Sequence, residues 1–377
     1  MLVAQLRATL PRTAFAFRGY DLSSLGRSEE LLAHGKYGPI VREELIRAGG
    51  YYTQWTGRPI DLVGRVESRT ETSIETFADA NVLILAMEGA QLRLLEECFG
   101  IRYAAARMAY GFSVGELAAL IASGVFSLKE VLRICSPLSD DVIELSADVS
   151  LAILFSRGQK LAADEVRRLC LRINQEGRGV IGVAAYLSPN SLTLMGQGDT
   201  LDRFAARMNA ELTDRAILRR KNGRWGPLHT PITWEKDVRS RFAINMHLME
   251  GGFTAPVPPV FSLATGQFSY DDGNARSILD QWVDHPQRLW DAVYKTLTLG
   301  IETVIHVGPA PNIFPATFTR LSENVAALTR SSLRARALAG IVQRPWLKAL
   351  IPERAALLRA PAVRHVILED WLLDQPG

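Results

Sequence analysis

Short apolar runs and amphipathic segments alternate along this chain, a pattern typical of an α/β protein. Residues 13–17 and 303–307 are apolar runs of strand length, so each predicts a buried strand. Residues 101–106 predict a third short strand. Residues 77–98 have a helical period and are apolar enough for a buried helix, and the run 117–121 predicts another.

The pattern changes in the middle of the chain, where strand-length runs and amphipathic helices follow the order β-α-β-β-α-β. This order is the signature of a ferredoxin-like unit. We therefore predict an α/β fold in which a large hydrolase-like subdomain has a mostly parallel sheet and carries a small ferredoxin-like insert. The expected bounds are 1–145 and 222–330 for the large subdomain, 146–221 for the insert, and 331–377 for a C-terminal extension.

Composition agrees with a folded protein and narrows its setting. Hydrophobic residues make up 47% of the 377 residues, enough for a sizeable core, and the net charge of +3 gives no general case for nucleic acid binding. Cys98, Cys135 and Cys170 have no metal-ligand spacing and suit a reducing compartment. No apolar run approaches the roughly 18 residues of a membrane span. We expect a soluble, cytoplasmic protein.

The segment Gly111-Phe112-Ser113-Val114-Gly115 has the Gly-x-Ser-x-Gly spacing of a nucleophile elbow. The glycines fit because the sharp turn between a strand and a helix crowds any Cβ atom beside it. Such a turn exposes Ser113 Oγ, and the helix behind it offers a backbone N–H to a developing oxyanion. The alternative is a chance turn, since short patterns of common residues recur in unrelated chains.

A serine elbow followed by a ferredoxin-like insert resembles the acyl-carrier-protein acyltransferase family, which includes the malonyl-CoA:ACP transacylases. The resemblance extends over about residues 13–320 and rests on four blocks in a fixed order. These blocks are Phe17-Arg18-Gly19-Tyr20, Gly111-Phe112-Ser113-Val114-Gly115-Glu116, Leu228-His229-Thr230-Pro231 and Val304-Ile305-His306-Val307-Gly308-Pro309. The first block stands where the family has Phe-Pro-Gly-Gln.

The resemblance implies covalent catalysis on a thioester. Ser113 would attack the carbonyl carbon while His229 acts first as base and then as acid. In the family a backbone carbonyl orients the histidine and a glutamine lies close by, for which Gln281 is the expected counterpart. The backbone N–H groups of Val114 and Tyr20 would form the oxyanion hole. No bound cofactor or metal is implied, and the substrates would be thioesters of coenzyme A or phosphopantetheine.

Several positions depart from the family pattern, and most of the changes remove polarity. Leu138 stands where malonyl-specific members carry an arginine for the substrate carboxylate. A malonyl group is therefore not the expected substrate, unless another arginine such as Arg133 reaches into the site. Phe112 replaces a histidine, and either lines an acyl pocket or is a packing residue. Leu187 replaces an asparagine, and Leu228 lies in a specificity loop that matches neither the malonyl nor the methylmalonyl tetrapeptide. Together these residues predict an apolar substrate pocket.

A basic cluster lies shortly before the candidate histidine. Arg219, Arg220, Lys221 and Arg224 fall within six residues. Such a cluster is usually a solvated strand end. At the border of the site it could instead dock an acidic carrier protein and the phosphate of its phosphopantetheine arm.

The sequence therefore predicts an acyltransferase that moves an acyl group without a free carboxylate through a seryl acyl-enzyme. The donor would be coenzyme A or a carrier protein, the acceptor an acyl carrier protein, and the pathway fatty acid or polyketide biosynthesis. Two alternatives remain open. One is an editing hydrolase in which water resolves the acyl-enzyme, and the other is a non-catalytic carrier-binding pseudoenzyme.

Overall fold

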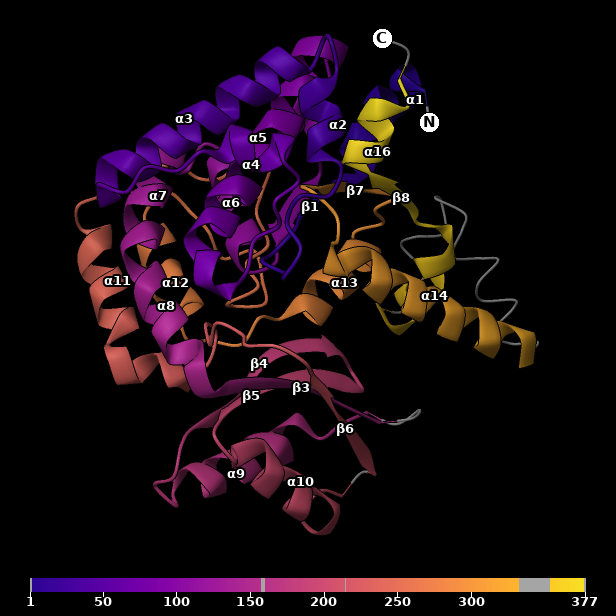
Figure 1. Cartoon of the computed structure of the whole chain (residues 1–377). Helices are drawn as coiled ribbons and strands as arrows, with labels where there is room; N and C mark the ends of the chain where they lie inside the picture. Colours follow the sequence, from indigo (N-terminus) through magenta and orange to yellow (C-terminus); the bar gives the residue numbers. More distant parts are fainter. Residues whose placement is uncertain (1, 157–159, 214, 332–352, 376–377) are drawn as a thin grey trace.

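The computed structural model describes residues 2–156, 160–213, 215–331 and 353–375, and its elements form a large and a small subdomain (Figure 1). The large subdomain is built on a parallel sheet with the strand order β2-β1-β7-β8. Its strands are β1 Thr13–Phe17, β2 Met108–Gly111, β7 Thr303–Val307 and β8 Arg364–Ile367. β1 is buried throughout, because Phe15 and Phe17 face one apolar cluster and Ala14 and Ala16 face another.

Helices pack on both faces of this sheet, and the 23-residue α5 is the longest of those described. α5 is buried on most sides and ends at Gly100, whose φ of 61° suits glycine at a helix C-terminus. No helix in the described ranges is both long and apolar enough to cross a membrane. The helices are α1 Val3–Thr9, α2 Ser28–Ala33, α3 Gly38–Thr56, α4 Leu62–Glu67, α5 Phe77–Phe99, α6 Val114–Ala122, α7 Leu128–Cys135, α8 Ser139–Leu145, α11 Val238–Met246, α12 Ala275–Trp282, α13 Leu289–Thr298, α14 Ile313–Ser331 and α16 Leu368–Leu373.

The small subdomain is an antiparallel sheet of order β4-β5-β3-β6 with two helices against it. It has its own apolar core, to which both helices contribute. Its elements are β3 Val149–Ser156, α9 Ala163–Asn174, β4 Ile181–Ser188, β5 Ser191–Gln197, α10 Thr200–Glu211 and β6 Ala216–Lys221. The predicted α/β class and the β-α-β-β-α-β order of the insert are confirmed.

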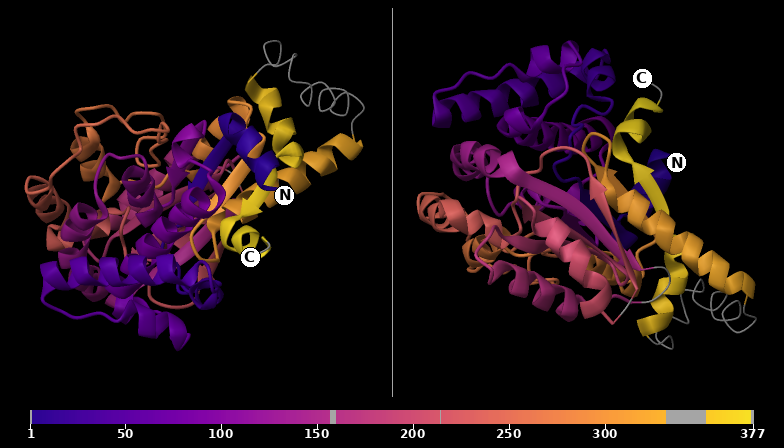
Figure 2. Two further views of the ribbon diagram at one scale, coloured as in Figure 1. Left: turned by 90° about the horizontal axis from the view of Figure 1, so that it is seen from above. Right: turned by 60° about the horizontal axis from the view of Figure 1, so that its bottom comes forward.

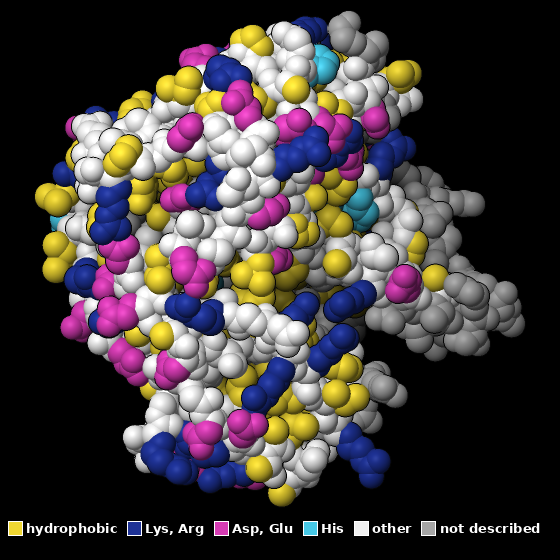
Figure 3. Space-filling model, in the orientation of Figure 1, with side chains coloured by type: hydrophobic (Ala, Val, Ile, Leu, Met, Phe, Trp, Pro, Cys, Tyr) yellow, Lys and Arg dark blue, Asp and Glu magenta, His cyan; other side chains and the backbone are white. Residues whose placement is uncertain are grey.

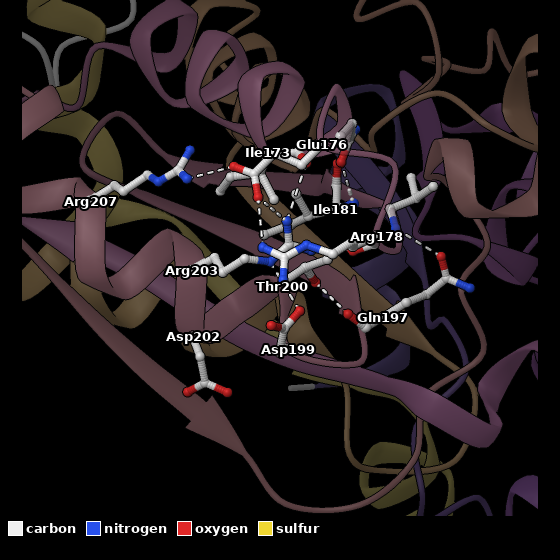
Figure 4. A network of polar contacts seen from close by, with 12 residues as sticks. Ile173, Glu176, Arg178, Ile181, Gln197, Asp199, Thr200, Asp202, Arg203 and Arg207 are labelled. Atoms are coloured by element: carbon white, nitrogen blue, oxygen red, sulfur yellow. Dashed lines mark hydrogen bonds and ion pairs between the residues drawn. The ribbon is translucent and has the colours of Figure 1, made fainter.

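An ion-pair network fixes the outer end of the small subdomain (Figure 4). Glu176, in the turn after α9, lies 2.7 Å from Arg203 and 2.5 Å from Arg207, both on α10. Arg203 also reaches Asp199, 3.0 Å away at the start of the same helix. The network ties the two helices together far from the large sheet.

Two sequence predictions are corrected by the structure. The strand expected at 101–106 lies instead at 108–111, and Tyr103–Ala105 form a turn of 3-10 helix. Ala104 and Ala105 are exposed, whereas Ile101, Tyr103 and Ala106 are buried, so the apolar run is a half-buried turn rather than a strand. The shift brings the strand directly in front of the serine turn.

The C-terminal segment is the second correction, because it is part of the large subdomain rather than a separate extension. β8 adds a fourth parallel strand beside β7, and the Trp371 ring of α16 packs edge-on against Phe99 with centroids 5.0 Å apart. The indigo α1 and yellow α16 consequently lie on the same side of the molecule (Figures 1 and 2). Residues 332–352, the first part of the expected extension, lie outside the described residues.

Candidate active site

The serine turn connects β2 to α6 at the carboxyl edge of the parallel sheet. Ser113 has φ 54° and ψ −121°, a backbone conformation that non-glycine residues rarely adopt outside functional turns. A Cβ atom on Gly111 would lie 2.0 Å from the Gly115 carbonyl carbon, and one on Gly115 would lie 2.3 Å from the Arg18 oxygen. Neither position has room for a side chain, as a nucleophile elbow requires.

His229 lies directly beside this serine. Its Nε2 is 2.8 Å from Ser113 Oγ, and its Nδ1 is 2.7 Å from the carbonyl oxygen of Trp282. A carbonyl oxygen only accepts, so Nδ1 must carry the proton and Nε2 is left free to accept one from the hydroxyl. Burial lowers the pKa of His229 to about 4, which keeps the imidazole neutral at physiological pH.

The glutamine beside this pair is Gln287 and not Gln281. Gln281 is partly exposed on α12, and its side-chain amide lies 3.4 Å from the carbonyl of Ser277 one turn earlier. Gln287 is fully buried; its Oε1 accepts the Ser113 backbone N–H at 3.0 Å, and its Nε2 lies 3.3 Å from His229 Nδ1. The helix ends before Pro286, so the extended segment after the proline, rather than the helix before it, enters the site.

Trp282 was not singled out from the sequence, although it contacts both members of the pair. Its carbonyl accepts from His229, and its indole Nε1 donates to the Ser113 carbonyl oxygen at 3.1 Å. A tryptophan at the end of an amphipathic helix looks like an ordinary core residue. No local pattern distinguishes it, because its partners are more than 50 positions away.

The two backbone N–H groups expected to hold an oxyanion lie on the two segments that meet at Ser113. Val114 is the first residue of α6, where backbone N–H groups have no partner within the helix. Tyr20 follows Gly19, whose added Cβ would lie 2.6 Å from the Phe112 carbonyl oxygen, so this loop touches the elbow. The role of the two N–H groups stays a prediction.

A narrow pocket extends from Ser113 between α5, α6, α8 and α11, and its volume is about 480 Å³ when the space open to solvent is included. Most of its wall is aliphatic or aromatic, and none of the lining residues is charged. The lining residues are Phe77, Asn81, Ser113, Val114, Leu117, Cys135, Leu138, Val142, Leu228, Val238, Phe242, Trp282 and Val283. Across the described part of the chain, no three His, Cys, Asp or Glu side chains come together as a metal-binding group.

Comparison by sequence finds relatives in polyketide biosynthesis, and no family model matches the chain. The chain is 26% identical over 326 residues to the spectinabilin polyketide synthase system protein NorB of Streptomyces orinoci. The aligned region covers 85% of this chain but 14% of that protein. It is 25% identical to mycoketide-CoA synthase of Mycobacterium tuberculosis, covering 86% of this chain and 7% of that enzyme. The chain thus spans a small share of these relatives.

Comparison by structure is more decisive. The malonyl-CoA:acyl carrier protein transacylase of Xanthomonas oryzae superposes with a TM-score of 0.64 at 22% identity, over 82% of this chain and 91% of that enzyme. The chain has the malonyl-CoA:ACP transacylase fold. The acyltransferase domain from module 8 of the salinomycin polyketide synthase gives the same TM-score at 20% identity, over 82% of this chain and 67% of that one. The predicted resemblance is confirmed at the level of fold.

Not all of the pocket residues predicted from the transacylase pattern line the pocket. Leu138 and Leu228 do, whereas Phe112 and Leu187 pack against the apolar cluster on the other face of the sheet. For Phe112, in the turn after β2, this packing matches the second of the two alternatives left open by the sequence, and Leu187 on β4 packs in the same cluster. Arg133 does not enter the pocket either; it donates to the Leu248 carbonyl at 2.6 Å and lies over the Trp55 ring.

Three of the four basic residues predicted for carrier docking lie on β6, an edge strand of the small subdomain's sheet. Arg219, Arg220 and Lys221 are exposed on β6, and Arg220 pairs with Asp202 at 2.5 Å on the helix-covered side of the sheet. Because side chains alternate along a strand, Arg219 and Lys221 share the opposite face. Arg224 pairs with Glu75 of the large subdomain at 2.8 Å. Figure 3 shows Lys and Arg side chains along the hollow between the subdomains.

Proposed function

We propose that this chain is a serine acyltransferase that moves an acyl group without a free carboxylate from a thioester donor to an acyl carrier protein. The observation that carries the proposal is the 2.8 Å contact between Ser113 Oγ and His229 Nε2 beside an uncharged pocket. The donor is coenzyme A or a second carrier protein, since both present the acyl group on the same phosphopantetheine thiol.

In the first half-reaction Ser113 Oγ attacks the thioester carbonyl carbon while His229 Nε2 takes its proton. The Nδ1–H bond to the Trp282 carbonyl holds the ring in the required tautomer. The N–H groups of Val114 and Tyr20 stabilise the tetrahedral oxyanion. Collapse breaks the carbon–sulfur bond, and the departing thiolate receives the proton from His229.

In the second half-reaction the carrier thiol gives its proton to His229 and its sulfur attacks the seryl ester. The second tetrahedral oxyanion forms in the same hole. Breaking the ester bond returns the proton to Ser113 Oγ and leaves the acyl group on the carrier. The same groups therefore serve both directions, as reversible transfer between thioesters requires.

The lining of the pocket supports a neutral acyl group. Leu138 is 7% exposed and stands where a carboxylate-binding arginine would be needed, and Arg133 is bound elsewhere. Burying a carboxylate without a partner costs several kcal/mol. The malonyl group in the names of the structural neighbours is therefore not the substrate that we propose here.

A carrier partner is supported by one neighbour and by the charge of β6. A structure described as a type II polyketide synthase acyl carrier protein in complex with its malonyl-transacylase matches with a TM-score of 0.64 at 18% identity. Reversing Arg219 and Lys221 to Glu should raise the KM for the carrier about 10-fold or more and leave loading from acyl-CoA unchanged. Arg167→Glu, a charge reversal at an exposed position of α9, is the control.

Intact-mass measurement after incubation with a mixture of neutral and carboxylated acyl-CoAs tests the function. We expect a neutral acyl adduct that disappears in Ser113→Ala and persists in Ser240→Ala, a change at an exposed serine. Labelled acyl groups should then pass to a carrier faster than they are released to water. Faster hydrolysis would indicate the editing thioesterase, and no adduct across the panel would indicate the pseudoenzyme.

A further inference from the structure

A fully buried arginine lies beneath the loop that carries the Tyr20 N–H. Arg18 is 0% exposed, and all three guanidinium nitrogens donate to backbone carbonyls. Nε lies 2.9 Å from the Gly19 oxygen, Nη2 lies 2.9 Å from the Ser23 oxygen, and Nη1 lies 2.6 Å from the Pro309 oxygen. The guanidinium thus joins both ends of the 19–23 loop to the segment after β7.

The surroundings of Arg18 show that this position is specialised. Its backbone N–H donates to Glu88 Oε1 at 2.9 Å, and a Cβ on Gly308 would lie 2.6 Å from its Cγ. Burial raises the pKa of Glu88 well above its usual range and so weakens it as a counter-charge. The cation is therefore satisfied mainly by carbonyl dipoles, and these belong to the loops around the site.

The other side of the same loop touches the serine turn. Gly19 lies against the Phe112 carbonyl, and the Arg18 carbonyl lies against Gly115. A shift of the loop would move the Tyr20 N–H relative to Ser113, because only Gly19 separates Tyr20 from Arg18. Oxyanion donors must lie within about 3 Å of the reacting oxygen to be effective.

We propose that Arg18 is a positioning residue for acyl transfer: its planar guanidinium clamps the 19–23 loop to Pro309 and so aims the Tyr20 backbone N–H at the thioester oxygen. This inference rests on the proposed function. The family pattern has proline at this position, which fixes the backbone through its ring. In this chain a three-point clamp made by a side chain replaces that local restraint.

The test compares Arg18→Lys and Arg18→Met with a matched control, Arg276→Met. Arg276 also donates to three backbone carbonyls, that of Met246 at the end of α11 and those of Met249 and Gly251 in the loop after it, and this loop is not part of the Ser113 site. The readouts are single-turnover acylation of Ser113, the split between kcat and KM, and Tm. Lysine keeps the charge but cannot bridge three carbonyls in one plane.

We expect Arg18→Lys to slow acylation about 10- to 100-fold with little change in KM, since one misaimed donor costs part of the roughly 100- to 1,000-fold that donor removal costs. Arg276→Met should lower Tm while acylation per folded molecule stays unchanged. Wild-type acylation rates in folded Arg18→Lys would overturn the inference, as would a raised KM with unchanged kcat. If the wild type forms no adduct, the proposed function fails instead.

Discussion

Leu138→Arg should convert the pocket into one that accepts a carboxylated acyl group. Leu138 is 7% exposed in a wall without charged residues, so the new guanidinium has no other anion to bind. A charge-assisted bond between the guanidinium and a carboxylate contributes about 1.5–3 kcal/mol. Since about 1.4 kcal/mol corresponds to a factor of ten, malonyl loading should rise about 10- to 100-fold relative to the wild type.

Neutral acyl groups should respond in the opposite direction. An unpaired guanidinium among Leu117, Val142 and Phe242 is costly to bury, so the variant should lose stability and load neutral acyl groups more slowly. Malonyl-CoA should raise the Tm of Leu138→Arg more than that of the wild type, because it binds only the folded protein. Leu138→Met, similar in volume and uncharged, is the control.

The assay is intact-mass competition between malonyl-CoA and butyryl-CoA at equal concentration, read as the ratio of the two adducts on Ser113. A ratio in folded Leu138→Arg that equals the wild-type ratio would refute the argument from Leu138. Dominant malonyl loading by the wild type would refute it more directly, since the pocket would then hold a carboxylate without an arginine.

Three further predictions concern the turn, the glutamine and the histidine. Gly115→Ala should abolish acylation and lower Tm, since its Cβ would lie 2.3 Å from the Arg18 oxygen, whereas Gly124→Ala, with open space around it, should keep acylation and lose only stability. Gln287→Leu should slow acylation at least 10-fold, whereas Gln281→Leu should leave the rate unchanged. Burial lowers the pKa of His229 to about 4 from about 6.5. The unfolded chain therefore binds the extra proton first, and the free energy of unfolding should decrease by about 3 kcal/mol as pH falls from 6.5 to 4. In urea melts, His229→Asn should lack this part of the pH dependence of stability.

The sequence predicted the parts of this fold that have local signals. Residues 149–220 alternate strand and helix patterns in short blocks, and the small subdomain has that order. Gly111 and Gly115 flank Ser113, and their crowded environments explain why that pattern is informative. The displaced strand at 108–111 shows the limit of this approach, because a half-buried turn such as 101–106 and a buried strand can have similar hydropathy.

The site residues that were missed depend on tertiary contacts. Gln281 lies five positions before Pro286 and Gln287 directly after it. Because α12 ends at Trp282, Gln281 stays on the helix and Gln287, in the segment after it, reaches Ser113. Phe112 stands beside the nucleophile in sequence, yet it packs against the apolar cluster of Ala14 and Ala16 and does not line the pocket, a choice that only the tertiary structure makes. The pocket wall from Phe242 and Trp282 has no sequence signature, since α11 and α12 are recruited from more than 100 positions away.

Gln287 also has a mechanical consequence. Its side chain holds the Ser113 amide, while its backbone N–H donates to Ala184 and its carbonyl accepts from Tyr186, both at 2.8 Å on β4. Gln287 thus connects the turn that carries Ser113 to the sheet of the small subdomain. A hinge motion between the two subdomains would therefore displace Ser113. We therefore expect the two subdomains to keep their relative positions during the proposed reaction, so that the phosphopantetheine arm of the carrier makes the large movements.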